Sequence, residues 1–356
     1  MFENMTIQSH KGPYTVVFQD ELLSDPSRLF DGEPHFLIDS NVSRLYARPL
    51  RSIIEHPNTI EIEAVEENKS IQMAIPVMEK LVSNKVRRNH ILVAIGGGIV
   101  QDITCFIASS ILRGLTWRFV PTTLLAQADS CIGSKSSINL GETKNIIGTF
   151  NPPQTVFICG EFLETLEKKE IHSGLGEILK VHAIESAESF DRLAKDYDRL
   201  WADRNVLLGY IRAALRIKQP YIEIDEFDRE IRNIFNYGHS FGHAIESATH
   251  YAIPHGVAVT IGMEMANFIA VERGILPKLH FDRMHPTLFR NFSDHAKVQI
   301  PFEPLLAALM KDKKNTTSML RLIFPVGDEA KVQRIQIEPD EQFKNQCKAF
   351  LRALQG

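Results

Sequence analysis

The segment ILVAIGGGIVQDITCFIASSILRG (91–114) constrains the fold more than any other. It starts as a continuous apolar run, turns at three glycines and continues with a helical pattern closed by Gly114. Similar apolar runs end in polar or glycine-rich turns at 35–40, 119–123 and 155–160. Apolar strands that alternate with helices are typical of a parallel sheet covered on both faces. The first part of the chain is therefore predicted to be an α/β domain.

A helix is predicted over 70–85, where Ile71, Ile75, Met78 and Val82 recur at helical spacing. After residue 162 strand patterns become scarce. Helices are expected near 173–190, 204–223, 229–250, 257–273 and 303–312, then one strand over 320–326 and a terminal helix around 339–354. We therefore expect an α/β, Rossmann-like nucleotide-binding domain over 1–160 and a mostly α-helical domain over 161–356.

Composition excludes several classes of function. The net charge of −4 over 356 residues argues against nucleic-acid binding. No apolar run reaches the length of a membrane span, and the first residues lack the pattern of a signal peptide. The four cysteines lie far apart without metal-ligand spacing, as in a cytoplasmic protein with reduced thiols. A cytoplasmic protein that acts on a small molecule is expected.

The turn AIGGGIVQD (94–102) is a candidate nucleotide site. Glycines let a backbone approach a pyrophosphate, and the following helix start offers N–H groups and a favourable dipole. Asp39 and Asn41, after the first strand, lie where an acidic residue commonly holds a ribose hydroxyl. On these residues alone, tight structural turns explain both features equally well.

Basic residues from several segments form a candidate anion site. The candidates are Arg113, Lys135, Lys144, Lys180, Lys218, Arg232 and Lys313. Lys135 and Lys144 lie within DSCIGSKSSINLGETKN (129–145), which is predicted to be a structured loop. Its hydroxyl, amide and ammonium donors, Asn145 included, suit a phosphate.

Four histidines lie within NYGHSFGHAIESATHYAIPHG (236–256). His239 and His243 are four residues apart, so that on a helix they face the same way and can bind zinc together. A catalytic zinc also needs further ligands and an open position, for which His255 and Glu177 are candidates. Spacing does not decide between the three histidines and two of them with Glu177. His250 is expected to be peripheral.

In their order, several of these segments resemble the 3-dehydroquinate synthase family of sugar phosphate cyclases. The segments are GGGIVQD, LRG, PTTLLAQADS, TKNIIGTF, SGLGEILK, RNIFNYGHSFGHAIE, PHGVAV and MKDKKN. The resemblance spans residues 35 to 326 and implies a dehydroquinate synthase-like fold, in which the second domain binds metal and substrate.

By these motifs, the resemblance implies the roles of individual residues. The metal, Zn²⁺ or Co²⁺, would be held by Glu177, His239 and His255. NAD would be bound by Asp39, Asn41, Glu66, Lys69, Gly97, Gly98, Asp102, Thr122, Thr123, Asp129 and Lys144. Substrate contacts would come from Arg113, Lys135, Asn145, Lys180, Lys218, Arg232, Asn236, His243 and Lys313, or Lys314 in place of Lys313. Of these, Lys135, Lys180, Lys218, Arg232, Asn236 and His243 would be catalytic, and Arg113 would reach a partner subunit in a homodimer.

The implied activity is that of a carbon–oxygen lyase. NAD⁺ oxidises a ring hydroxyl, phosphate leaves by β-elimination, the hydride returns, and an aldol step closes a carbocycle. Arg232 suits a substrate carboxylate and favours 3-deoxy-arabino-heptulosonate 7-phosphate, the substrate of the shikimate pathway enzyme that makes 3-dehydroquinate.

Departures from the family motifs, at Gln101, Ser134, Thr143 and Cys159, keep a second substrate class open. The alternative is a cyclase for sedoheptulose 7-phosphate or another sugar phosphate. More distant alternatives are a metal-dependent polyol dehydrogenase and a non-catalytic ligand-binding descendant.

Overall fold

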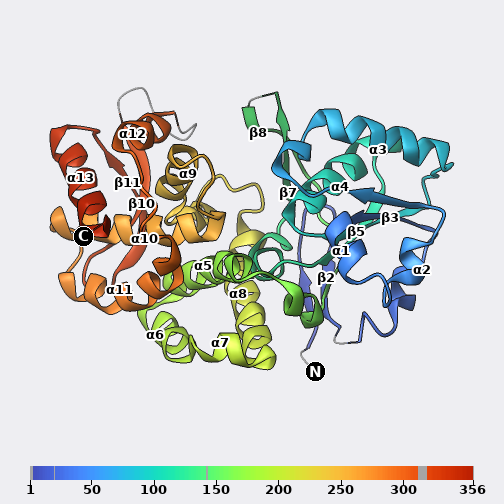
Figure 1. Ribbon diagram of the computed structural model, residues 1–356, viewed down its shortest axis with the longest axis horizontal. Helices are drawn as coiled ribbons and strands as arrows, with labels where there is room; N and C mark the ends of the chain where they lie inside the picture. Colours follow the sequence, from blue (N-terminus) through green and yellow to red (C-terminus); the bar gives the residue numbers. More distant parts are fainter. Residues whose placement is uncertain (1–2, 20, 142, 312–318, 356) are drawn as a thin grey trace. The chain divides into compact units, whose positions relative to one another are not determined.

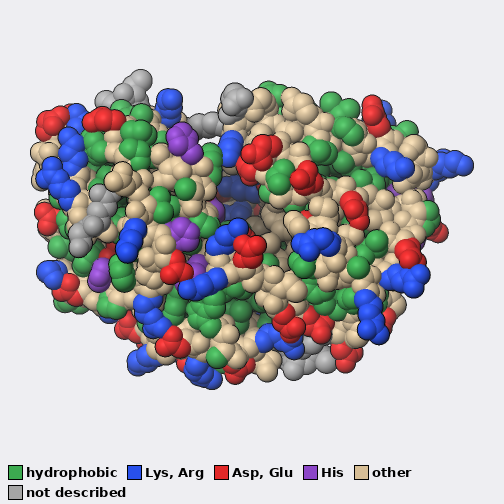
Figure 2. All heavy atoms as spheres, viewed as in Figure 1, with side chains coloured by type: hydrophobic (Ala, Val, Ile, Leu, Met, Phe, Trp, Pro, Cys, Tyr) green, Lys and Arg blue, Asp and Glu red, His purple; other side chains and the backbone are tan. Residues whose placement is uncertain are grey.

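The computed structural model describes residues 3–19, 21–141, 143–311 and 319–355 (Figure 1). The chain forms two compact units. The first comprises Met1–Glu167 with Gln219–Phe227, and the second comprises Lys168–Lys218 with Asp228–Gly356. The first unit therefore includes a short segment that the chain contributes from the middle of the second. Basic and acidic side chains are interspersed over the face shown in Figure 2, as the small net charge leads one to expect.

A seven-stranded sheet forms the centre of the first unit, in the order β1-β2-β9-β6-β5-β3-β4. The strands are β1 (Met5–Ile7), β2 (Tyr14–Phe18), β3 (Pro34–Asp39), β4 (Thr59–Ile62), β5 (Ile91–Gly96), β6 (Thr116–Pro121) and β9 (Thr155–Ile158). All neighbours are parallel except β1 and β2. Because β4 lies on one side of β3 and β5 on the other, the strand order reverses between β3 and β5. Ligands of open parallel sheets bind beyond the strand ends at such a point.

Helices cover this sheet on both faces, as predicted from the apolar strands. These helices are α1 (Ser40–Leu45), α2 (Arg51–Ile54) and α4 (Gly98–Ser110), while α3 (Ile71–Ser83) packs on α4. Phe36 and Ile38 of β3 join a core with Val42 of α1 and Ile53 of α2, while α4 packs on β5 and β6. All residues of β5 are buried, so that this strand is a continuous apolar run without alternation of buried and exposed side chains.

The helix α3 forms where it was predicted. Its buried face, however, is not made by the apolar residues that predicted the helix, Ile71, Ile75, Met78 and Val82. The buried residues are Ala74, Val77 and Leu81, whereas Ile75 is 50% exposed and Val82 is 63% exposed. Two apolar stripes lie side by side on this helix. Packing against α4 and against the strand β7 decides which of them is covered, and the periodicity alone does not.

The prediction of a loop over 129–145 is wrong, because the segment is largely a β-hairpin. After a π-helical turn at Ala126–Ser130, β7 (Lys135–Leu140) pairs antiparallel with β8 (Thr143–Phe150). Ile138 is fully buried between less buried neighbours, which gives β7 a partly alternating pattern. The strand was not predicted, because its segment is rich in small polar residues and glycines and contains no continuous apolar run.

The second unit is mostly helical, as expected. Its helices are α5 (Lys168–Glu185), α6 (Ala187–Asp196), α7 (Arg199–Ala202), α8 (Arg204–Ile224), α9 (His239–Ala248), α10 (His255–Glu272), α11 (Lys278–Phe292), α12 (Phe302–Met310) and α13 (Glu341–Gln355). The last residues of α8 belong to the first unit. The strand predicted over 320–326 is β10 (Leu320–Val326), and it pairs with an unpredicted strand, β11 (Lys331–Ile337).

The prediction of one helix over 229–250 is wrong. A 3₁₀ turn (Ile231–Asn236) comes first, and α9 starts at His239 after Gly238, whose φ of 76° lies in the left-handed region. A Cβ at Gly238 would lie 2.5 Å from the carbonyl oxygen of Val259, so only glycine fits there. The helices α6, α7 and α11 were not predicted, and neither were α1, α2, β1, β2 and β4 of the first unit.

All four cysteines are buried and free, as expected. In the described part of the chain, none of the helices combines the length and the apolar character that crossing a membrane requires.

Candidate functional site

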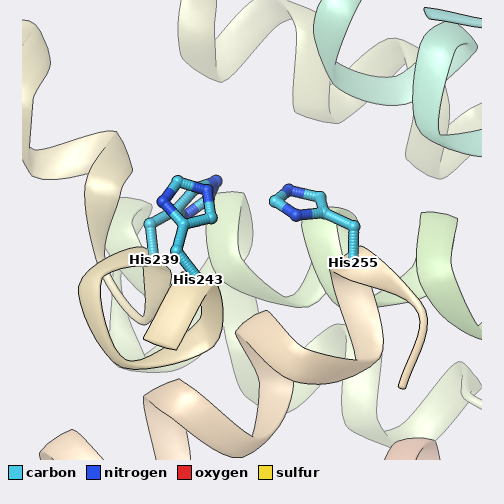
Figure 3. A group of neighbouring side chains, drawn as sticks. All are labelled: His239, His243 and His255. Atoms are coloured by element: carbon cyan, nitrogen blue, oxygen red, sulfur yellow. The ribbon is translucent and has the colours of Figure 1, made fainter. Parts of the chain in front are cut away.

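Three of the four histidines lie together in the second unit (Figure 3). His239 and His243 are one turn apart at the start of α9, and His255 is the first residue of α10. One ring nitrogen from each lies within 4.8 Å of the others, a spacing that allows a shared metal ion. His250 is exposed and lies outside this group. The structure therefore places the two helix starts so that three imidazoles face one another.

Glu177 of α5 lies against two of these histidines. Its Oε1 atom is 3.6 Å from Nε2 of His239 and 3.3 Å from Nε2 of His255, and the residue is 1% exposed. Its other oxygen, Oε2, forms an ion pair with Lys180, one turn further along α5. Neither carboxylate oxygen accepts a hydrogen bond of normal geometry from the described residues. A buried carboxylate in this condition suits a cation beside it.

Glycines next to the site residues bring the helices together. A Cβ on Gly256 would lie 1.8 Å from the carbonyl oxygen of Ser173, and one on Gly176 would lie 2.0 Å from the carbonyl oxygen of Gly256. The backbones of α5 and α10 are therefore in direct contact beside Glu177 and His255. A Cβ on Gly242, which precedes His243, would lie 3.0 Å from Cα of Val259 in α10, a close but less tight approach. The small residues in SGLGE, GHSFGH and PHG thus position the side chains beside them.

The electrostatics of the cluster suit metal ligands. Burial opposes ionisation of Glu177, but Lys180, His239 and His255 outweigh it and hold the pKa of the carboxyl well below its usual range. Burial and then Lys180 keep the pKa of His239 well below its usual value, so this imidazole is neutral. For His255, burial is outweighed by the neighbouring carboxylates of Glu177 and Glu246, which raise its pKa to about 10. A cation bound there would take the place of that proton.

These residues therefore fit a divalent metal such as zinc. Two neutral imidazoles and a carboxylate, or three imidazoles, are donor sets that zinc accepts while coordination positions stay open. The geometry brings Glu177, His239, His243 and His255 close enough for either set.

Other predicted residues of the second unit lie on nearby elements. Lys218 of α8 and Arg232 of the 3₁₀ turn are buried, and Lys180 lies 6.0 Å from the ring centre of Phe235. The side-chain amide of Asn236 donates to the carbonyl oxygen of Asn233 over 3.0 Å. Lys313 and Lys314 lie outside the described residues. Buried lysine and arginine side chains are rare unless they serve an anion or an ion pair.

In the first unit, the glycine turn and Asp39 lie on both sides of the point where the strand order reverses. Gly97 precedes α4 as its N-cap, and a Cβ there would lie 2.9 Å from Cγ2 of Thr123. Gly98 has nothing within 4 Å of a Cβ, so the space beside it is open. Thr122 follows β6, and its N–H donates to the carbonyl oxygen of Gly96 over 3.0 Å. The side chain of Asp39 accepts from the N–H of Asn41 over 2.9 Å and caps α1.

A polar network connects several further candidates. Lys69 bonds to Asp102 over 3.2 Å and to Oδ1 of Asn145 over 2.7 Å. Burial is the main cause of the raised pKa of Asp102, about 6. Lys144 lies 3.7 Å from Glu66. Asn145, predicted to contact substrate, thus lies among residues predicted to contact NAD.

Two residues near these networks were missed by sequence reasoning. Asn139 donates to Oε1 of Glu66 over 3.0 Å and accepts from the N–H of Asn145 over 2.9 Å. Gln101, which departs from the family motif, exchanges two hydrogen bonds of 2.7 Å with Ser130 and so attaches α4 to the following turn. An amide in a strand or helix carries no spacing signal, so only the fold reveals these contacts.

Three further predicted residues belong to the first unit. Asp129 is in the π-helical turn, Lys135 is the first residue of β7 and is exposed, and Arg113 is exposed after α4. Leu112 and Arg113 both have positive φ values, 51° and 68°. This uncommon conformation directs the chain sharply before Gly114.

The chain is similar to known proteins over most of its length. The family model described as 3-dehydroquinate synthase N-terminal matches residues 59–173, and that described as 3-dehydroquinate synthase C-terminal matches 174–315. A 3-dehydroquinate synthase of Alkaliphilus metalliredigens (strain QYMF) is 32% identical over 345 residues, 95% of this chain and 97% of that protein. One of Dictyoglomus turgidum (strain DSM 6724 / Z-1310) is 37% identical over 294 residues, 82% of this chain and 81% of that protein.

Among solved structures, the chain is similar to 2-epi-5-epi-valiolone synthase from Streptomyces hygroscopicus subsp. jinggangensis 5008 with NAD⁺ and Zn²⁺ bound. The TM-score is 0.82 at 27% sequence identity, and the match covers 96% of each chain.

Proposed function

Because the chain belongs to the 3-dehydroquinate synthase family, we propose that it converts 3-deoxy-arabino-heptulosonate 7-phosphate to 3-dehydroquinate and phosphate. The observation that carries the proposal is the buried contact of Glu177 with His239 and His255. Buried ion pairs add little net stability, so a carboxylate held between two imidazoles and an ammonium group suits a functional role such as metal binding. NAD and zinc or cobalt are the proposed cofactors.

For the metal we propose Glu177, His239 and His255 as ligands, with His243 as a contact of the substrate phosphate. When bound, the metal supplies Lewis acidity to substrate oxygens and NAD⁺ supplies a reversible hydride acceptor. His243 fits its role because it is exposed and lies one helical turn from His239, so that it can reach an anion beside the metal.

For NAD we propose the open space beside Gly98 as the position of the pyrophosphate, at the start of α4. Asp39, at the end of β3, would hold ribose hydroxyls across the point where the strand order reverses. The network of Lys69 and Asp102 supports the hairpin β7–β8 beside this position.

The cationic residues would serve the anionic substrate. Lys180 is buried beside Glu177 and adds positive charge where an enolate would develop. Lys135, Asn145 and Lys218 are proposed phosphate contacts. Arg232 is proposed to bind the substrate carboxylate, because its planar guanidinium donates two parallel hydrogen bonds.

The experiment is a panel of sugar phosphates incubated with purified protein, NAD⁺ and Zn²⁺. Release of phosphate from the heptulosonate phosphate, abolished by Arg232→Gln, supports the proposal. If phosphate is released from sedoheptulose 7-phosphate instead, the enzyme is a related cyclase that makes a cyclitol. In that case Arg232→Gln should have little effect on KM, because that substrate has no carboxylate.

We further propose a cytoplasmic homodimer. Four buried free thiols fit a reducing compartment. Arg113 is exposed on a backbone held in the left-handed region, which suits an arginine presented to a partner subunit. Light scattering should give twice the mass of the chain, and Arg113→Ala should raise KM without changing that mass. A monomeric enzyme with normal activity would contradict this proposal.

A further inference from the structure

Glu246, near the end of α9, is bonded to a site histidine. Its Oε2 atom lies 3.1 Å from Nδ1 of His255, while Nε2 of the same ring faces Glu177 at 3.3 Å. The side chain of Glu246 is only 13% exposed. The two nitrogens of one imidazole thus face two carboxylates from different helices.

The turn between α9 and α10 holds this contact in place. His250 and Tyr251 both have positive φ values, 51° and 61°, which is uncommon for residues other than glycine. The N–H of Tyr251 donates to the carbonyl oxygen of Glu246 over 2.8 Å. The chain therefore turns back sharply just after Glu246, the residue that bonds to His255.

The chemistry of the contact fixes the tautomer of the ring. An ionised carboxylate only accepts hydrogen bonds, so Nδ1 of His255 must carry the proton that it donates to Glu246. The lone pair of a neutral ring then lies on Nε2, the atom that faces Glu177 and His239. Such carboxylate–histidine pairs orient metal ligands and increase their basicity.

We propose that Glu246 is a positioning residue for the metal, which fixes the tautomer and the orientation of His255 without touching substrate, NAD or the metal itself. This inference rests on the proposed function, because it requires a metal bound by His255. It assigns a role to the last residue of RNIFNYGHSFGHAIE, for which the sequence indicated none.

The test measures zinc binding by the purified protein, in competition with a chromophoric chelator, together with the visible absorption of the cobalt-loaded protein. Glu246→Ala should raise the zinc Kd by about 10- to 100-fold, the usual cost of losing such a partner. Glu246→Gln, which keeps an acceptor oxygen but no charge, should raise it less. In both variants the cobalt absorption should change, because the geometry at His255 relaxes.

A matched control is Glu264→Gln. Glu264 of α10 is also buried and also pairs with a histidine, His285, but outside the metal cluster. Its substitution should leave the zinc Kd and the cobalt spectrum unchanged, although it affects stability. Thermal melting of the zinc-free proteins shows whether the Glu246→Ala variant is folded. If it is not, the zinc Kd and the cobalt spectrum of Glu246→Gln provide the test.

The outcomes separate the inference from the proposed function. If a folded Glu246 variant keeps the zinc Kd and the cobalt spectrum of the wild type, the role of Glu246 is overturned but the proposed function is not. Wild-type protein that binds no divalent metal overturns both. Equal weakening by Glu264→Gln would show a general effect of packing and would also overturn the inference.

Discussion

The Oε1 atom of Glu177 lies 3.3 Å from Nε2 of His255, although the two residues belong to different helices and are far apart in the sequence. Their helices touch backbone to backbone at Gly176 and Gly256, the immediate neighbours of the two residues. The distance is therefore set by main-chain packing and not by flexible side chains. A site built in this way is preorganised, because few rotamers must be fixed when a ligand binds.

His243 tests which residues complete the metal site. If it contacts the phosphate, as proposed, His243→Ala should leave the zinc Kd unchanged and raise KM for the sugar phosphate by about tenfold or more, the cost of one charge-assisted hydrogen bond. Chelator competition and steady-state kinetics measure the two quantities. A large loss of zinc affinity would instead make His243 a ligand. His250→Asn, at an exposed histidine of the same segment, is the control.

Gly256→Ala should separate α5 from α10. The new Cβ would lie 1.8 Å from the carbonyl oxygen of Ser173, so the helices must shift. Overpacking of this kind typically costs about 1–3 kcal/mol, and we expect a lower Tm together with weaker zinc binding. Gly209→Ala in α8, where nothing lies within 4 Å, should be neutral or slightly stabilising. Normal zinc affinity in the Gly256 variant would show that the glycine contact does not set the site.

Gly98→Ala should weaken NAD binding while the fold stays intact. The space beside Gly98 is empty of protein atoms, so a methyl group is tolerated by the fold but would occupy the place proposed for the pyrophosphate. We expect a rise of roughly tenfold in the Kd for NAD, equivalent to the loss of about one hydrogen bond, with an unchanged Tm. Calorimetric titration and thermal melting measure both. Unchanged NAD affinity would place the cofactor elsewhere.

Stability should fall in mild acid because of His35, which lies near the start of β3, away from Asp39. Burial is the main cause that lowers the pKa of His35 from 6.5 to about 4, and the neighbouring His90 adds to it. The neutral ring is favoured in the folded state, so this stabilisation is complete above pH 6.5 and is lost as the pH falls toward 4. The loss amounts to up to about 3 kcal/mol. The free energy of unfolding, measured with urea, should depend less on pH in His35→Gln than in the wild type. An equal pH dependence in the two proteins would refute the role of His35.

Much of the first unit could be predicted from the sequence, because strands buried on both faces leave continuous apolar runs. The hairpin β7–β8 could not, since its polar and glycine residues resemble a loop, and neither could the buried face of α3, which depends on its neighbours. In the second unit Gly238 interrupts a pattern that reads as one helix. Its requirement for a positive φ becomes evident only when Val259 is packed against it.

For the site, the helical spacing predicted that His239 and His243 share a face, and they do. The spacing could not predict that His255 and Glu177 lie beside these two histidines, because the four residues meet only where three helices pack together. The resemblance to a family supplied that combination. It assigned no role to Glu246 or Asn139, whose hydrogen bonds become evident only in the fold.

The most direct measurement follows phosphate and NADH together while purified protein turns over 3-deoxy-arabino-heptulosonate 7-phosphate with NAD⁺ and Zn²⁺. We expect steady release of phosphate with no net accumulation of NADH, and loss of both zinc and activity in His255→Ala. Stoichiometric NADH without phosphate would identify a dehydrogenase and contradict the proposed function.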